Sequence, residues 1–261
     1  PQGFGSGWRK NVNLADGYCK APDDPFMSQF MGPIESGVDL NRNFPFGWNS
    51  TKGAGSSGDA CDATFRGASA ASEPETAAIV RYVAGTRQQD GNFTGGLLRD
   101  RRTAAANDFA TGAPGDYEGL YIDIHSFSQL VLWPWGIRRE SLRGDSKTAN
   151  DDGMAAFAQR LAWYNGYAAT QIIDYDTDGT TTDTFYGELG APSFTIELGT
   201  SFYEPCEEFE KNTFPKNVAS LRYAARTLKA PYQLPLGPDA ADIQLSAATV
   251  VTRNLGSGDS G

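Results

Sequence analysis

The clearest alternation of apolar and polar residues lies at residues 193–198 and predicts a β-strand there. In this strand Phe194, Ile196 and Leu198 fall on one face. The residues between them, including the charged Glu197, fall on the opposite face. We therefore expect a strand with one face in the core and a carboxylate on the other.

Three shorter apolar runs predict further strands. Residues 120–124 form one of them and lead directly into His125. Residues 130–133 form another, which ends at Pro134, and residues 38–40 form a short third. Pro is expected at such an end because it lacks the N–H that a strand ladder uses.

Helical spacing of apolar residues predicts three helices. Ser72 is a good N-cap and Glu75 follows three residues later, which is the spacing of a capping box, so we expect a helix to begin here. Residues 151–163 carry an apolar stripe on one face, and residues 216–229 predict the last helix. Strands that alternate with helices indicate an α/β fold.

The remaining chain is rich in Gly, Pro and small polar residues and is predicted as loops, at residues 1–36, 47–71 and 90–118. Proline residues punctuate residues 231–238, which we predict to be a linker, and residues 243–251 suggest one strand of an accessory β segment. We find no internal repeat.

The charge balance is acidic, with 22 Lys and Arg against 32 Asp and Glu and a net charge of −10. A nucleic-acid partner is not expected, because binding a polyanion needs a concentrated basic surface. No apolar stretch approaches the roughly 20 residues of a membrane span. We also expect no signal peptide within the chain. Few lysines and many Gly, Ser, Thr and Asn residues favour an exported protein, either secreted or periplasmic.

The chain contains three cysteines, none of them in a C-x-x-C pair, which excludes a zinc ribbon. Cys19 and Cys61 are able to pair, which leaves Cys206 without a partner. Two segments, beginning at Asn49 and Asn92, match the N-glycosylation acceptor pattern, a match that also arises by chance.

Two polar residues stand at predicted strand ends, where α/β sheets bind ligands. These are His125, which is the one histidine of the chain, and Glu197. A buried carboxylate is costly without a partner or a role, so Glu197 is a candidate functional group. Asn41 and Arg42 follow another predicted strand, and an Arg fork suits an anionic group of a ligand. A structural histidine and a loop salt bridge are the alternatives.

Three segments in this order strongly resemble the zinc carboxypeptidase family of the carboxypeptidase A/B type. They are residues 37–44 (GVDLNRNF), 124–129 (IHSFSQ) and 195–198 (TIEL). Further matches are residues 8–11 (WRKN), 65–67 (FRG) and 72–76 (SEPET), and Tyr175 precedes Glu197 by the family's spacing of 22 residues. The resemblance covers about residues 8–230, so we expect residues 1–230 to be the C-terminal portion of a catalytic domain and residues 231–261 a linker and tail.

The resemblance implies a fold with a mixed, mostly parallel, twisted sheet flanked by helices, here without the family's first strands. It implies a zinc cofactor, with His125 as a ligand and Glu197 as the general base that acts on a zinc-bound water. Arg9 is expected to polarise the scissile carbonyl, and Asp39 to orient a histidine ligand.

The resemblance also implies a substrate, the C-terminal residue of a peptide or protein. Asn41 and Arg42 would hold its carboxylate, and Tyr175 would close over it. By spacing, Thr182 occupies the position that selects the substrate side chain. No acid stands there, although Asp183 is adjacent, so we expect apolar or broad specificity.

Two other residues, Thr177 and Thr195, are expected to line the same pocket. A competing reading of this region is calcium binding, because residues 174–179 (DYDTDG) resemble the first half of an EF-hand loop. Phe185 stands where the bidentate Glu of such a loop is needed, which favours an acidic surface turn.

The sequence departs from the family at the zinc site. The family takes two ligands from a His-x-x-Glu motif upstream of the WRK segment, and this chain has no second histidine. Catalytic zinc normally has three protein ligands and an open position. The chain is then the C-terminal piece of a nicked enzyme paired with its own N-terminal fragment, a truncated chain, or a zinc-less relative that binds peptide C-termini. A hydrolase of peptidoglycan or another amide is a further alternative. Phe127 replaces the family's usual tyrosine.

Overall fold

A four-stranded sheet lies at the centre of the molecule. The computed structural model describes residues 9–19, 36–102, 107–137, 147–171 and 176–237. Within these ranges the sheet consists of β3 (Tyr121–Ser126), β4 (Leu130–Leu132), β5 (Ala168–Thr170) and β6 (Ser193–Leu198), in the order β3-β6-β4-β5. The pairs β3–β6 and β4–β5 are parallel and β4–β6 is antiparallel. The predicted α/β fold with a mixed, mostly parallel sheet is confirmed.

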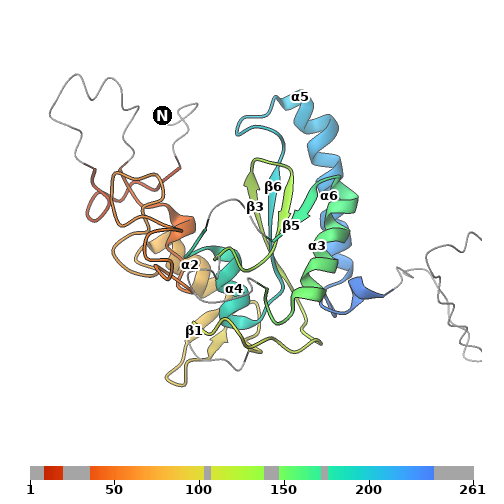
Figure 1. The fold of residues 1–261 in the computed structure, drawn as a ribbon, viewed down its shortest axis with the longest axis horizontal. Helices are drawn as coiled ribbons and strands as arrows, with labels where there is room; N and C mark the ends of the chain where they lie inside the picture. Colours follow the sequence, from red (N-terminus) through yellow and green to blue (C-terminus); the bar gives the residue numbers. More distant parts are fainter. Residues whose placement is uncertain (1–8, 20–35, 103–106, 138–146, 172–175, 238–261) are drawn as a thin grey trace, which may run out of the picture.

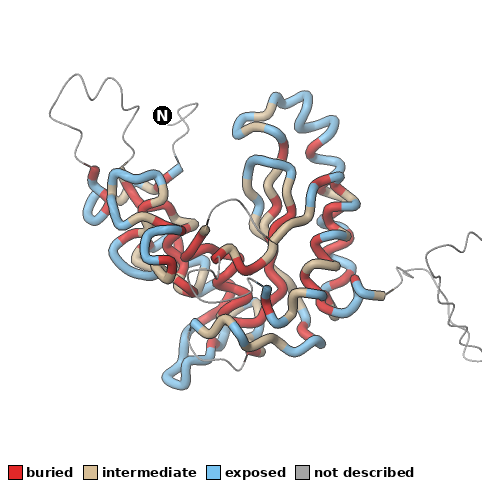
Figure 2. Tube along the Cα trace, viewed as in Figure 1, coloured by how far each residue is buried: buried red, intermediate tan, exposed pale blue. Residues whose placement is uncertain are grey.

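Helices cover both faces of this sheet (Figure 1). On one side lie α3 (Asp151–Asn165) and α6 (Phe214–Arg226), which pack against each other; on the other lies α4 (Thr181–Leu189). The fully buried Phe194 of β6 stacks on Phe157 of α3, with ring centroids 4.8 Å apart. The predicted apolar face of β6 therefore packs on α3, and Figure 2 shows both elements largely buried.

Helix α4 was not predicted, and its environment explains why. Polar residues of α4 are buried along with its apolar ones, so the helix has no solvent face to produce an amphipathic pattern. It begins at a regular cap, where the Thr180 side chain accepts a hydrogen bond from Asp183 N. It ends at Gly190, which has a left-handed conformation.

The region that carries Asn41 and Arg42 is irregular. In place of the strand predicted at residues 38–40, the chain forms a 3-10 turn, η1 (Leu40–Arg42). Asp39 caps this turn by accepting a hydrogen bond from Asn41 N at 3.2 Å. The strand prediction was wrong because the Asp39 side chain offers the backbone a local alternative to pairing.

The helix predicted at Ser72 begins slightly later, as α2 (Pro74–Val83), with Glu73 at the N-cap. The capping box is absent because the Ser72 hydroxyl donates to the Glu73 carboxylate instead. Two short strands that follow, β1 (Gly85–Arg87) and β2 (Phe93–Gly95), form an antiparallel hairpin. They were missed, as was β5, because three residues are too few to show a period.

The last described segment contains α5 (Cys206–Glu208), a π-helical turn η2 (Phe209–Thr213), α6, and a 3-10 turn η3 (Leu234–Leu236). Tyr232 is buried, and its hydroxyl donates to Gly190 O at 2.8 Å. Residues 231–237 thus pack on the domain and are more than a linker. The strand expected at residues 243–251 lies outside the described residues.

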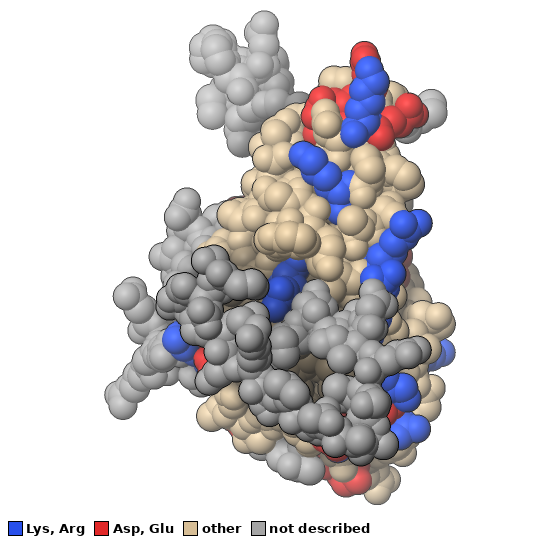
Figure 3. Space-filling model, turned by 90° about the vertical axis from the view of Figure 1, so that its right-hand side faces the viewer, with Lys and Arg blue, Asp and Glu red and all other residues tan. Residues whose placement is uncertain are grey.

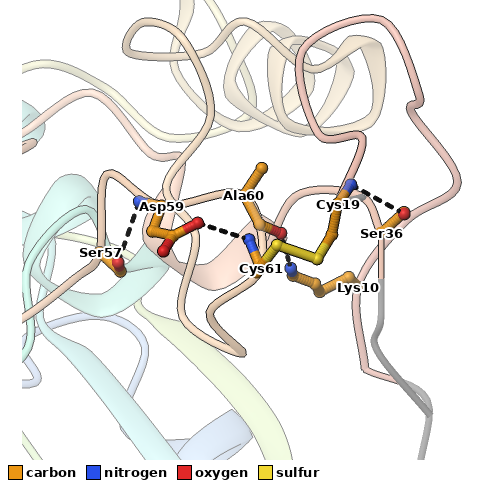
Figure 4. Close-up of a disulfide and its surroundings, with 7 residues drawn as sticks. All are labelled: Lys10, Cys19, Ser36, Ser57, Asp59, Ala60 and Cys61. Atoms are coloured by element: carbon orange, nitrogen blue, oxygen red, sulfur yellow. Dashed lines mark hydrogen bonds between the residues drawn. A yellow bond between two sulfur atoms is a disulfide. The ribbon is translucent and has the colours of Figure 1, made fainter. Parts of the chain in front are cut away.

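A disulfide joins Cys19 to Cys61 (Figure 4). This is the pairing considered from the sequence alone. Beside it Lys10 Nζ donates to Ala60 O at 2.8 Å, and Cys19 N donates to Ser36 Oγ at 3.0 Å. Cys206 is exposed and free.

None of the described helices combines the length and apolar character needed to cross a membrane. On the face drawn in Figure 3, Lys and Arg side chains are scattered and gather into no single basic patch, and acidic side chains lie beside those at the upper end.

Candidate functional site

The register of β3 against β6 brings the strand-end polar residues together. His125 lies directly opposite Glu197, and Asp123 lies opposite Thr195. Because side chains alternate along a strand, all four point to the face that α4 covers and not to the face that packs on α3. The two candidates that sequence pattern placed at separate strand ends therefore share one site.

His125 pairs with Asp123, with Nε2 2.9 Å from Oδ2. Burial lowers the pKa of His125, but the hydrogen bond and charge of Asp123 and the charge of Glu197 outweigh burial and raise it above its usual value. Burial also raises the pKa of the Asp123 carboxyl. The hydrogen bond and charge of His125 outweigh burial, so the pKa of Asp123 is lowered. Asp123 also accepts a hydrogen bond from the Thr181 hydroxyl. The imidazole is thereby held through Nε2.

The carboxylate of Glu197 makes no hydrogen bond or ion pair with any residue in the described part of the chain. Burial raises the pKa of its carboxyl, while the charges of His125 and Arg9 oppose that rise. A partly buried carboxylate with no fixed partner and a raised pKa is suited to accept and release a proton.

Asn41 joins the irregular segment to the strands. Its Oδ1 accepts a hydrogen bond from Thr181 N at 3.0 Å, and its Nδ2 lies 3.4 Å from His125 Nε2. The amide therefore bridges η1, the first turn of α4 and the end of β3.

Arg42 is a buried cation, only 6% exposed. Its Nη1 donates to Asn41 O at 2.8 Å, whereas its Nε is buried and has no hydrogen-bond partner among the described residues. No carboxylate in that part of the chain forms an ion pair with it. An arginine in this state is expected to have an anionic ligand, because leaving a buried charge unpaired is costly.

Arg9 lies at the edge of the site, and its Nε is 2.9 Å from Asp39 Oδ2. Asp39 was expected to orient a histidine ligand. Its contacts in the structure are with Arg9 and with Asn41 N, whereas the carboxylate beside His125 is Asp123.

One cavity of about 280 Å³ collects nearly all the predicted residues. Its lining includes Arg9, Asn41, Arg42, His125, Thr177, Thr182, Asp183, Thr195 and Glu197. Tyr175 lies outside the described residues. Residues from five separate stretches of sequence thus face a single space.

Hydroxyl groups form one wall of the cavity. Thr182 Oγ1 and Thr195 Oγ1 are 2.6 Å apart, so each satisfies the other. Asp183 is buried beside them and accepts from Gly136 N at 3.0 Å. Burial, helped by the nearby charge of Asp178, raises the pKa of the Asp183 carboxyl to about 7.

One of the acidic residues at 174–179, Asp178, has a structural role. Asp178 is fully buried, so the expectation of an acidic surface turn was wrong for this residue. Its carboxylate accepts hydrogen bonds from Thr51 N at 3.0 Å, from Thr51 Oγ1 at 2.6 Å and from the Ser56 hydroxyl. These bonds tie the chain at residues 51–56 to the segment that lines the cavity.

Sequence reasoning missed two features of the site. Asp123 precedes His125 by two residues on one strand, and strand alternation would have placed both on one face. Phe127 and Phe202 also line the cavity and make an edge-to-face contact at 4.7 Å. Phe202 carries no local signal that would reveal this position.

The described residues fit a zinc ion only in part. Asp123 holds His125 Nε2, which leaves Nδ1 as the nitrogen for a metal, the arrangement that orients many histidine ligands. Among the described side chains, however, no group of three His, Cys, Asp or Glu residues is placed to hold a metal ion. The described residues therefore do not contain the set of three ligands that catalytic zinc needs.

The fold and cavity define an α/β protein with its ligand cavity beyond the carboxyl ends of parallel strands. More specifically, the chain belongs to the zinc carboxypeptidase family, whose sequence profile matches residues 6–214. The resemblance seen in the sequence is confirmed.

Individual relatives agree with this membership. The chain is 31% identical to human carboxypeptidase A5 over 196 residues, covering 73% of this chain and 34% of that one. It is 27% identical over 196 residues to a metallocarboxypeptidase A-like protein of Trichophyton verrucosum, covering 73% and 36%. The chain thus spans about a third of the length of these relatives.

The fold is also that of solved carboxypeptidases. Carboxypeptidase A from Helicoverpa armigera superposes with a TM-score of 0.55 at 24% identity, over 85% of this chain and 46% of that one. Thrombin-activatable fibrinolysis inhibitor superposes with a TM-score of 0.51 at 21% identity, over 74% and 42%.

Proposed function

We propose that this chain forms the carboxylate-binding and general-base part of a zinc carboxypeptidase, which removes the C-terminal residue of peptides or proteins. The observation that carries the proposal is Arg42, a buried guanidinium whose Nε has no hydrogen-bond partner among the described residues, in the same cavity as His125 and Glu197. A substrate with a free C-terminal carboxylate would supply the missing acceptor, and an Arg fork is the best side chain for that group.

The residues divide the reaction between them. Arg42 and Asn41 hold the terminal carboxylate, and Tyr175 closes over the substrate. Glu197 accepts a proton from the attacking water and later gives it to the leaving amine. Arg9 stabilises the negative charge that develops on the scissile carbonyl oxygen.

Zinc, when bound, lowers the pKa of a bound water to about 7 and polarises a carbonyl. His125 would be one of its ligands through Nδ1. We propose that the other ligands come from polypeptide outside this chain, such as an N-terminal fragment of the same protein. Support comes from the single histidine of the sequence and from the coverage of about a third of each relative.

The first experiment identifies that polypeptide. Denaturing, reducing mass spectrometry with peptide mapping on the natively purified protein should reveal a co-purifying segment with a His-x-x-Glu motif. Metal analysis of the same sample should then find zinc. A single species with no such segment and no zinc would contradict the completed site.

Glu197→Gln tests the chemistry. In the enzyme completed by that segment, this variant should lose peptide hydrolysis by roughly 100- to 10,000-fold, since a positioned general base contributes that much. Peptide binding, measured by calorimetry, should be retained because Gln preserves the shape of the side chain. Normal hydrolysis by Glu197→Gln would refute the assignment.

Arg42→Gln tests the recognition of the carboxylate. Affinity for peptides with a free C-terminus should fall roughly 10- to 100-fold, because hydrogen bonds to charged groups contribute about 1.5–3 kcal/mol. Affinity for the amidated peptides should hardly change. Arg226→Gln, at an exposed position of α6, is the control, and thermal unfolding confirms that each variant is folded. Equal losses for free and amidated peptides would contradict the role of Arg42.

For the side chain of the terminal residue we propose apolar or broad selectivity. Thr182 and Thr195 bond each other and carry no charge, so these two side chains provide no partner for a charged terminal residue. Turnover of a peptide series that differs only in its last residue measures this selectivity directly.

A second function is favoured by one observation. Because the described residues hold no three-ligand metal group, the chain on its own would bind peptide C-termini without cleaving them. This reading predicts Arg42-dependent affinity that is unaffected by Glu197→Gln, in a protein that has neither zinc nor hydrolytic activity.

We further propose that the protein is exported, either secreted or periplasmic. The disulfide between Cys19 and Cys61 supports this, because disulfides persist in oxidising compartments. Detection of the protein in the culture medium or periplasmic extract tests the assignment.

A further inference from the structure

The chain carries two matches to the N-glycosylation acceptor pattern, Asn-x-Ser/Thr, at residues 49–51 and 92–94. The pattern alone does not distinguish them. The structure places the two segments in different environments: Asn92 and Thr94 are exposed at a hairpin, whereas Asn49 and Ser50 are only partly exposed and Thr51 is buried.

The segment at residues 92–94 leads from the hairpin turn into β2. Asn92 and Thr94 are exposed, while Phe93 between them is buried. The backbone of the turn is closed by hydrogen bonds from Gln88 N to Asn92 O at 2.7 Å and from Gly91 N to Gln88 O at 3.0 Å. The acceptor asparagine thus stands on an ordered, solvent-facing turn, which Figure 2 shows as an exposed projection.

Contacts of residues other than Asn92 anchor the hairpin to the rest of the domain. The guanidinium of Arg87 lies over the Phe93 ring at 4.5 Å and pairs with Glu188 of α4 at 2.5 Å. In Figure 1 the hairpin lies at the opposite end of the molecule from the carboxyl ends of β3 and β6. A sugar chain on Asn92 would therefore leave the cavity open.

The segment at residues 49–51 is folded into the protein. Asn49 Oδ1 and Ser50 Oγ are buried, and neither has a hydrogen-bond partner among the described residues. Thr51 is buried as well, and its hydroxyl donates to Asp178. To expose Thr51, and with it the whole acceptor pattern, this segment would have to leave its contacts with Asp178.

From this contrast we propose that Asn92 is an N-glycosylation site and that Asn49 is not. The proposal rests on the export of the protein proposed above. The donor is an oligosaccharide carried on a polyprenyl diphosphate. The Asn92 amide nitrogen forms a bond to C1 of the first sugar and loses one proton, while the bond from C1 to the diphosphate oxygen breaks. Polyprenyl diphosphate is the leaving group, and no electron transfer is involved.

The test is secretion of the full chain from a eukaryotic host, followed by peptide mass mapping before and after treatment with an amidase that removes N-glycans. This amidase converts a glycosylated Asn into Asp, which marks the modified peptide. We expect the mark at Asn92 and no mark at Asn49. An unmodified Asn92 peptide, or a glycan at Asn49, would overturn the proposal.

Matched variants sharpen the result. Asn92→Gln and Thr94→Ala should each abolish the glycan, Thr94→Ser should retain it in part, and Asn49→Gln should leave the glycan mass unchanged. Peptide hydrolysis is assayed separately on the completed enzyme. Loss of hydrolysis in a protein glycosylated at Asn92 would count against the peptidase and not against the glycosylation site.

Discussion

The two walls of the cavity are built in different ways. The wall that carries His125 and Glu197 consists of strand ends, and its positions follow from the register of β3 and β6. The wall that carries Arg42 and Thr177 is irregular chain, held by side chains such as Asn41 and Asp178 that bond to distant backbone and hydroxyl groups.

The difference shows how the positions of the side chains are fixed in each wall. On the strand side, apolar packing behind the sheet fixes the backbone, and alternation then aims the polar side chains. On the irregular side no periodic backbone exists, so buried polar groups specify the position of the chain. Such groups are costly to bury and are effective only when their hydrogen bonds are complete.

The largest effect is expected from a loss of packing on the strand side. Phe194→Ala removes a fully buried ring that stacks on Phe157, and should lower the free energy of unfolding by about 3–5 kcal/mol. Chemical denaturation measures this loss. The exposed Trp163→Ala on α3 serves as a control and should change stability far less. Similar losses in the free energy of unfolding for the two variants would contradict the conclusion that packing behind the sheet holds the strand ends in place.

A smaller loss of stability is expected on the irregular side. Asp178→Ala leaves Thr51 N and the hydroxyls of Thr51 and Ser56 without their acceptor, which should cost about 2–3 kcal/mol. Because Asp178 adjoins Thr177 in the cavity wall, peptide affinity should fall as well. Asp178→Asn, which keeps one acceptor oxygen, should lose less of both. Unchanged stability in Asp178→Ala would show that this wall does not depend on the buried carboxylate.

A further effect concerns pH. The pKa of Asp183 is about 7 in the folded protein and about 4 in an unfolded chain. Between these pH values the folded state keeps a proton that the unfolded state has released. The contribution of Asp183 to the free energy of unfolding is therefore highest at acidic pH and falls as the pH rises through this window. Above about 7 the contribution of Asp183 no longer changes.

Asp183→Asn should remove this part of the pH dependence, because the amide does not titrate. The measurement is the free energy of unfolding in buffers on both sides of the window, for the variant and the original chain. If the variant and the original chain show the same difference in the free energy of unfolding between the two buffers, groups other than Asp183 cause the pH dependence.

The same contrast explains what sequence was able to predict. Alternation located β6 with its correct bounds, because one of its faces is apolar and the period is two residues. A short apolar run located β3, although the strand extends two residues beyond the predicted end. Helix α4 escaped because it is buried on all sides. Strand-end chemistry pointed to His125 and Glu197, whereas the roles of Arg9, Asn41 and Arg42 came from resemblance to a family.

Long-range partners had no local signal at all. The hydrogen bonds from Thr51 to Asp178 join residues 127 positions apart, and Phe202 meets Phe127 only in the folded chain. No periodicity within either segment encodes such a pair, so these contacts became visible only in three dimensions.

The disulfide between Cys19 and Cys61 closes a loop of chain in which Asn41 and Arg42 are carried. Cross-linking residues 42 positions apart removes conformational freedom from the unfolded chain, worth about 4 kcal/mol in the loop-closure treatment. The strands that carry His125 and Glu197 lie outside this loop. A thiol reductant should therefore loosen the segment that carries Asn41 and Arg42 first, while the strand ends keep their positions. The proposed carboxylate binding and the proposed proton transfer would then respond to oxidation state separately.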